Sequence, residues 1–140
     1  MLKKILVPMD GSVHAGKALD LASDMTLKYE ATIYLIYVKP PLSRISEQDV
    51  RQRINESNQE TAGKIIKEAE EEVKKRGIKN YQLAILEGHP AQEIVEFAKK
   101  NGVDMIILGS HGASDLEGLL LGSVSYKVCN IAHCTCITVK

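Results

Sequence analysis

The feature that most restricts the fold of this chain is a regular alternation of five apolar runs with four stretches of helical period. Short apolar runs rich in branched residues are typical of strands that are covered on both faces, which indicates a parallel sheet. Right-handed crossovers turn such an alternation into an open, doubly wound α/β sheet. The predicted strands are Ile5–Val7, Ile33–Val38, Leu83–Leu86, Met105–Leu108 and Cys136–Val139.

Start and stop signals divide the segments between these runs into helices. Ser12 is placed to cap the first helix, and the second extends from about Glu47 to Lys75 before Gly77. Pro90 begins the third, which ends before Gly102. The apolar positions that mark the helices are Ala15, Ala18, Leu19, Ala22 and Met25; Val50, Ile54, Thr61, Ile65, Ala69 and Val73; Ala91, Ile94, Val95 and Ala98; and Leu121, Val124, Val128 and Ile131.

Length and charge limit the classes of protein to which the chain can belong. Its 140 residues suit a single domain spanning 1–140, with one loose segment at 39–47 after the second strand. The 18 basic and 18 acidic residues cancel, so we expect no nucleic-acid partner. The N-terminal apolar run is too short for a signal peptide, and no later run is long enough for a membrane span. We therefore expect a soluble, cytoplasmic protein.

Three cysteines lie close together in the sequence, at Cys129, Cys134 and Cys136. An odd number in one cluster does not make a disulfide framework. His133 beside them suggests a metal site, but a four-ligand zinc site usually shows two separated ligand pairs. Small reduced thiols are the favoured interpretation, with metal binding as the alternative.

The stretch GSHGASDLEGLLLGSVS, residues 109–125, combines four glycines with a run of three leucines. It follows the fourth strand, and PMDGS (8–12) follows the first. In a sheet ordered 3-2-1-4-5 these loops face each other where the strand order reverses, which is where open α/β sheets bind ligands. Glycines let backbone amides approach a phosphate, and a helix N-terminus favours an anion. From the spacing alone, a flexible turn before a core helix is equally well supported.

The spacing of these glycines, G-x2-G-x9-G-[ST], carries a resemblance to a known family. Together with VPMDGS (7–12), EGHPAQEIVEFAKKNGVDMIILGSHG (87–112) and LLLGSVSYKV (119–128), it resembles the ATP-binding branch of the universal stress protein family. The resemblance extends from Lys3 to Val139. It implies a five-stranded parallel sheet in the order 3-2-1-4-5 with helices on both faces.

The resemblance also implies a site for ATP, and we expect Mg²⁺ to accompany the nucleotide because that ion favours phosphate oxygens. In this site Asp10 accepts hydrogen bonds from the adenosine moiety, Val38 offers backbone groups and an apolar wall to adenine, and the glycines with Ser123 hold the phosphates. Ser125 is expected to add a polar contact. The implied residues are Pro8, Asp10, Val38, Leu108, Gly109, Gly112, Gly122, Ser123, Val124 and Ser125.

The loop between the second and third glycines of the motif departs from the family pattern. Many relatives carry a basic residue where this chain has Ala113, and Asp115 and Glu117 follow. Two acidic groups weaken the binding of a triphosphate unless Mg²⁺ bridges them. The only obvious cations that could fold over the site are Lys39 and Arg44, and His111 is interpreted as a turn residue. An alternative role for Asp10 is to cap the first helix.

These observations favour a regulatory or stress-related protein in which nucleotide occupancy sets conformation or partner choice. A weak ATP hydrolase is the first alternative, and an interaction dimer without nucleotide is the second. The last strand, CTCITVK (134–140), is apolar and lies at the predicted sheet edge, which invites pairing. The resemblance implies that it pairs with its copy in a homodimer.

Overall fold

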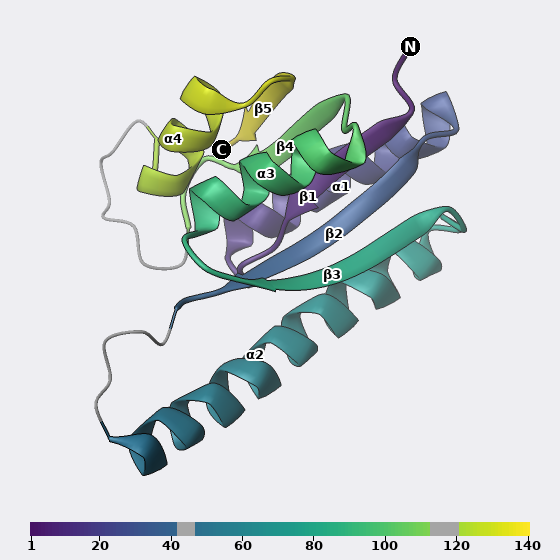
Figure 1. The fold of residues 1–140 in the computed structure, drawn as a ribbon. Helices are drawn as coiled ribbons and strands as arrows, with labels where there is room; N and C mark the ends of the chain where they lie inside the picture. The colour runs from purple at the N-terminus through teal and green to yellow at the C-terminus, as the bar shows by residue number, and fades with distance from the viewer. Residues whose placement is uncertain (42–46, 113–120) are drawn as a thin grey trace.

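A computed structural model describes residues 1–41, 47–112 and 121–140. Within these residues, strands and helices alternate along the chain as predicted, although the ends of several elements differ by a few residues. The elements are β1 (Lys4–Pro8), α1 (Val13–Tyr29), β2 (Thr32–Lys39), α2 (Gln48–Lys75), β3 (Tyr81–Glu87), α3 (Pro90–Asn101), β4 (Met105–Gly109), α4 (Ser123–Ile131) and β5 (Thr135–Val139) (Figure 1).

The strands form one parallel sheet in the order β3-β2-β1-β4-β5, which confirms the predicted topology. The chain winds outward from the centre in both directions, so β1 and β4 are neighbours although two strands separate them in the sequence (Figure 1). Their register pairs Ile5 with Met105 and Leu6 with Ile106. The loops that leave the carboxyl ends of β1 and β4 lead to helices on opposite faces, and this divergence opens a crevice.

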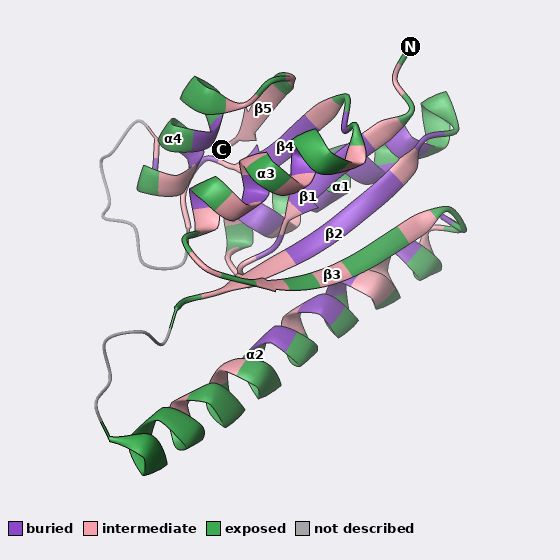
Figure 2. Cartoon of the chain, viewed as in Figure 1, coloured by how far each residue is buried: buried purple, intermediate pink, exposed green. Residues whose placement is uncertain are grey.

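Two hydrophobic layers cover the faces of the sheet. Alternate strand residues point to opposite faces, so Ile5 and Val7 pack with α1 and α2 whereas Leu6 packs with α3 and α4. Figure 2 shows the buried residues concentrated in the central strands and on the inward sides of the helices. The fully buried branched side chains come mainly from the strands: Ile5, Leu6, Val7, Ile33, Leu35, Ile36, Ile106 and Ile107.

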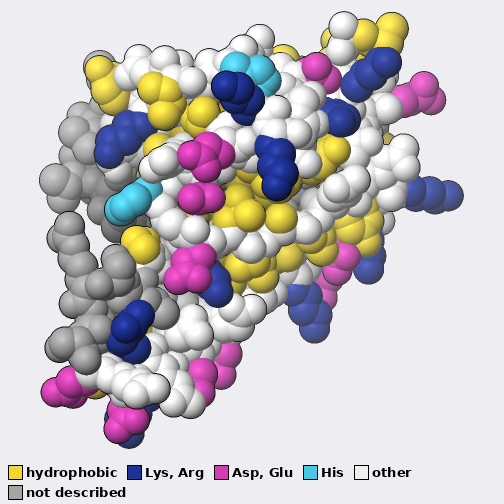
Figure 3. All heavy atoms as spheres, in the orientation of Figure 1, with side chains coloured by type: hydrophobic (Ala, Val, Ile, Leu, Met, Phe, Trp, Pro, Cys, Tyr) yellow, Lys and Arg dark blue, Asp and Glu magenta, His cyan; other side chains and the backbone are white. Residues whose placement is uncertain are grey.

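The prediction that the strands are covered on both faces is wrong for β3. Leu83 and Ile85 remain 38% and 36% exposed, because β3 is an edge strand. On the other face of the sheet, which α3 and α4 cover, apolar residues of β3 and α3 are half-buried. Figure 3 shows hydrophobic side chains among charged ones in this region. An apolar run in the sequence therefore indicates a strand without indicating how completely its neighbours cover it.

Only the second half of α2 packs on the sheet. Its buried residues begin at Ala62, and Figure 2 shows the N-terminal turns as largely exposed. Val50, predicted as part of the apolar stripe, is 40% exposed, and Thr61 is exposed. The residues that pack are Ala62, Ile66, Ala69 and Val73, with Ile65 half-buried. The stripe is thus shorter than predicted and is displaced by one position in its middle.

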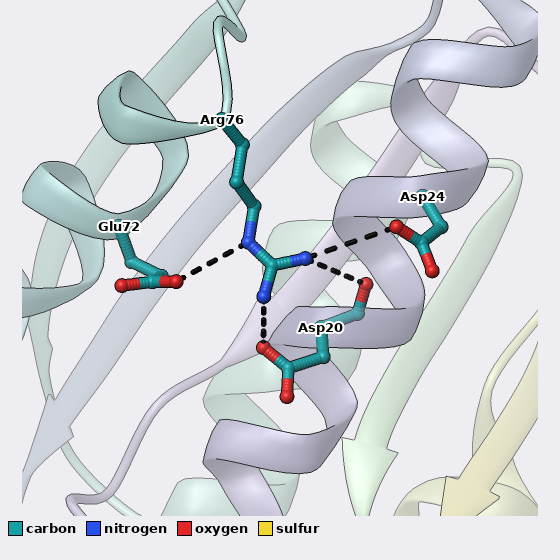
Figure 4. A network of polar contacts seen from close by, with 4 residues as sticks. All are labelled: Asp20, Asp24, Glu72 and Arg76. Carbon is teal, nitrogen blue, oxygen red and sulfur yellow. Dashed lines mark hydrogen bonds and ion pairs between the residues drawn. The ribbon is translucent and has the colours of Figure 1, made fainter.

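A single guanidinium joins the C-terminal end of α2 to α1 (Figure 4). Arg76 Nε lies 3.3 Å from Glu72 Oε1, Nη2 contacts Asp20 Oδ1, and Nη1 lies 3.8 Å from Asp24 Oδ1. Nη1 also donates to the carbonyl of Asp20 at 3.5 Å. This network joins α1 to α2 on the face of the sheet that both helices cover.

Candidate functional site

A hollow of about 280 Å³ opens at the carboxyl ends of β1, β2 and β4. Every residue of the predicted site except Gly122 lines it, so the fold brings together residues from distant parts of the sequence. The loop after β1 and the loop after β4 form two sides, and the starts of α3 and α4 form a third. The lining residues are Pro8, Met9, Asp10, Ala15, Tyr37, Val38, Pro90, Ile94, Leu108, Gly109, His111, Gly112, Ser123, Val124 and Ser125.

The loop after β1 is a tight turn built around Asp10. Asp10 Oδ1 accepts a hydrogen bond from the backbone N–H of Ser12 at 2.9 Å, and Gly11 between them has φ +81°. Only glycine adopts this backbone conformation without strain. Ser12 Oγ then accepts from the N–H of Ala15 at 3.1 Å and caps α1. Ser12 therefore fills the capping role considered for Asp10, whose half-buried carboxylate faces the hollow.

Gly109 allows α1 to approach the end of β4 unusually closely. A Cβ atom at Gly109 would lie 2.8 Å from the backbone nitrogen of Ala15 and 2.8 Å from His14 Cβ. These separations are far below van der Waals contact, so no other residue fits here without movement of the α1 backbone. The sequence pattern assigns Gly109 to the ligand, whereas in the structure its missing side chain first serves the packing of α1.

Hydrogen bonds tie the start of α4 to the end of β4. The N–H of Gly122 donates to the carbonyl of Ser110 at 2.6 Å, and Ser125 Oγ donates to the carbonyl of Gly109 at 2.6 Å. Gly122 precedes α4, so the helix begins two residues later than Leu121, which the apolar pattern had included. The first N–H groups of a helix have no partner within it, and at Ser123 and Val124 they lie beside the hollow.

The remaining walls are apolar. Val38 and Leu108 come from the ends of β2 and β4, and Pro90 and Ile94 lie one turn apart on α3. Tyr37 adds an aromatic ring from β2. Burial raises the pKa of the Tyr37 phenol, and the negative charge of Asp10 raises it further, so the phenol is protonated at neutral pH.

Sequence reasoning missed six of the lining residues: Met9, Ala15, Tyr37, Pro90, Ile94 and His111. The sequence does contain a signal for Pro90 and Ile94. Pro90 marks the first position of a helix, and a residue four positions later lies on the same face of that helix. The sequence indicates a turn residue at His111, whereas in the structure His111 lines the hollow and its Nδ1 lies 3.0 Å from Ser110 Oγ.

The described lining residues include one carboxylate, Asp10, and no lysine or arginine. Lys39, one of the two candidate cations, contacts Gln59 Oε1 of α2 through its Nζ at 2.8 Å. The other, Arg44, lies outside the described residues, as do Ala113, Asp115 and Glu117. Within the described ranges, no three His, Cys, Asp or Glu side chains are arranged to hold a metal ion, and no helix there is long and apolar enough to cross a membrane.

Comparison with known proteins agrees with this fold. Universal stress protein MJ0531 of Methanocaldococcus jannaschii is 38% identical over 100% of this chain and 83% of its own length. Universal stress protein YxiE of Bacillus subtilis is 31% identical over the whole of both chains. The solved structure of MJ0577, a universal stress protein of M. jannaschii, superposes with a TM-score of 0.86 at 30% identity, covering 100% of this chain and 96% of that one. The model of the universal stress protein family matches residues 1–140, and the chain belongs to that family.

Proposed function

We propose that the crevice binds an adenine nucleotide, ATP accompanied by Mg²⁺, and that the protein is a cytoplasmic regulator in which occupancy sets conformation or partner choice. One observation carries this proposal. The two glycine-containing loops and the start of α4 converge with Asp10 on a single hollow at the point where the strand order reverses. That point is where open parallel sheets bind nucleotides.

The lining divides into regions that suit the parts of a nucleotide. Val38, Leu108 and Ile94 offer an apolar wall for a base, and Asp10 offers an acceptor for ribose hydroxyls. The N–H groups at the start of α4 suit a phosphate. Mg²⁺ commonly keeps several waters and binds through phosphate oxygens, so it needs few protein ligands in such a site.

Solved proteins with the same fold support the class of ligand. Universal stress proteins have been solved in complex with cAMP and, from Archaeoglobus fulgidus, with dAMP, and one from Arabidopsis thaliana with AMP. Their identities to this chain are 24%, 20% and 16%. At such identities the likeness establishes the fold, so the proposal rests on the residues of this crevice.

A short chain of hydrogen bonds connects the crevice to the edge of the sheet. Ser110, whose carbonyl accepts from Gly122, donates its own N–H to the carbonyl of Val139 at 2.7 Å. Val139 is the last residue of β5, the edge strand next to β4. We propose that β5 pairs with its copy in a homodimer, and that nucleotide binding at the start of α4 affects this interface through Ser110.

Calorimetry with Mg-ATP tests nucleotide binding. We expect a dissociation constant in the micromolar range, about −8 kcal/mol. Gly122→Val should abolish binding because a branched side chain there blocks the approach of the phosphate to α4. Gly63→Val is the matched control, since Gly63 faces open space on α2. No heat and no thermal shift at millimolar Mg-ATP, with no nucleotide extracted from the purified protein, would refute the proposal.

We expect slow hydrolysis of the bound ATP. Phosphoryl transfer requires positive charge around the γ-phosphate, and the described lining has no lysine or arginine. Phosphate release from the protein with Mg²⁺ should therefore stay well below about one turnover per second. Faster release that disappears in both Asp115→Ala and Gly122→Val would favour the alternative, an ATP hydrolase.

A further inference from the structure

Two histidines from different elements meet at the rim of the crevice. His14 lies in the first turn of α1, and His111 follows β4. Their ring centroids are 5.3 Å apart, with the ring planes inclined at 55°. His111 lines the hollow, and its Nδ1 lies 3.0 Å from Ser110 Oγ. The pair is half-buried, which leaves both imidazoles in contact with solvent protons.

The position of this pair is set by the backbone. Because Gly109 has no side chain, His14 packs directly against the end of β4, and a Cβ atom at Gly109 would lie 2.8 Å from the carbonyl carbon of His14. His111 is two residues further along the same segment. The close approach of α1 to β4 at Gly109 therefore brings the two rings together.

A nucleotide phosphate brings negative charge to a crevice whose described lining contains no lysine or arginine. Histidine is the side chain that most readily gains a positive charge between pH 5 and 8. A phosphate beside an imidazole favours the protonated form of that ring, because opposite charges attract at short range.

We propose that His111, positioned by His14, recognises the phosphate of the bound nucleotide as an imidazolium, and that nucleotide binding therefore takes up a proton from solvent. This inference rests on the proposed function and adds the group that balances the phosphate charge. No covalent bond changes: a proton moves from solvent to the imidazole and is released when the nucleotide leaves.

The other titratable groups of the hollow are compatible with this assignment. Asp10, in the turn after β1, contributes a carboxylate to the same hollow, and burial keeps the Tyr37 phenol from β2 neutral at physiological pH. Helices α3 and α4 contribute no titratable side chain to the described lining, which there consists of Pro90, Ile94 and Ser123–Ser125. Asp115 and Glu117 follow His111 in the sequence and lie outside the described residues.

Proton uptake can be measured by titrating Mg-ATP into the protein in buffers of different ionisation enthalpy between pH 6 and 8. One coupled proton increases the affinity by up to about tenfold for each unit of decreasing pH. The terminal phosphate of the ligand also titrates near this range, so parent and variant are compared at each pH. We expect the parent to take up a fraction of one proton, and adenosine, which has no phosphate, to bind without uptake.

Substitution of single histidines tests whether the proton uptake depends on His14 and His111. His111→Gln should bind Mg-ATP more weakly at pH 6 and lose the uptake, and His14→Gln should reduce the uptake. His133→Gln, at an exposed position before β5, is the matched control and should behave like the parent. Binding of Mg-ATP with unchanged uptake in His111→Gln, or without uptake in the parent, would overturn this inference and leave the proposed function intact. No nucleotide binding by the parent at any pH would overturn both.

Discussion

Gly109→Ala is the substitution whose effect follows most directly from the structure. An added Cβ would lie 2.8 Å from three atoms of α1, two of them in the backbone. Ordinary contact requires several tenths of an ångström more, so α1 must move away from β4. Overpacking of this kind costs about 1–3 kcal/mol. At about 2.1 cal/mol/K per residue, the unfolding entropy of 140 residues converts this cost into a decrease in Tm of roughly 3–10 °C.

Thermal and urea unfolding, followed by circular dichroism, measure this effect. Gly16→Ala is the matched control in the same helix, because a Cβ there meets nothing within 4 Å. Alanine is favoured over glycine inside a helix by about 1 kcal/mol, so this variant should raise Tm by about 3 °C. The two glycine-to-alanine changes should therefore have opposite signs. If Gly109→Ala unfolds at the temperature of the parent or above, the close approach does not constrain the site.

Four further predictions concern stability, thiol chemistry and assembly. Arg76→Ala should lower the free energy of unfolding by about 1 kcal/mol, and by less at 1 M salt, since partly exposed ion pairs are screened. Backbone N–H groups at the start of the chain hold the pKa of Asp104 below its usual value, so its stabilisation is complete above about pH 4 and is lost on further acidification. Asp104→Asn should therefore reduce the acid sensitivity of Tm. Burial raises the pKa of Cys136 to about 12 and also raises that of Cys134, so a disulfide reagent at pH 8 should react fast only with exposed Cys129. Thr138→Pro should convert the proposed dimer into a monomer in light scattering.

The reason for choosing Thr138 lies in the hydrogen bonding of β5. The carbonyl of Val139 accepts from Ser110, so the backbone groups of Val139 face β4. Successive residues of a strand direct these groups to opposite sides, so those of Thr138 face outward, where a second copy would pair. Proline at 139 would disrupt the bond to β4 instead, and a monomeric Val139→Pro variant would not identify the interface.

The sheet was predictable because its central strands are buried on both faces, and burial of this kind leaves a continuous apolar signal. The runs at Ile5–Val7 and Met105–Leu108 are such strands, and their buried patterns are nearly complete. The edge strand β3 gives a similar run with less burial, so the pattern identifies the element and not its surroundings. Charged residues dominate α2, so its weak apolar pattern does not identify which positions pack on the sheet. The observed positions in the middle of the helix therefore differ by one residue from the predicted ones.

The site was predictable where the chain needs a special backbone and unpredictable where it needs only contact. The glycines and the Asp10 turn can be recognised in the sequence because few residues can replace them. Tyr37 and Ile94 occupy positions that read as ordinary strand and helix residues, and only the fold shows that they face the hollow. The contact between His14 and His111 depends on α1 approaching β4, which no local pattern records.

Charge balance in the crevice was the least predictable property, because it depends on where long side chains reach. Lys39 follows β2 directly and is near the crevice in the sequence, yet its Nζ bonds to Gln59 on α2. Among the described residues, the groups that remain to contact a phosphate are the backbone N–H groups at the start of α4 and the histidine pair. Backbone N–H groups carry no net charge, so they release few counterions when the ligand binds. We therefore expect nucleotide affinity to depend weakly on salt at pH 8 and more strongly at pH 6, where histidine gains a positive charge more readily.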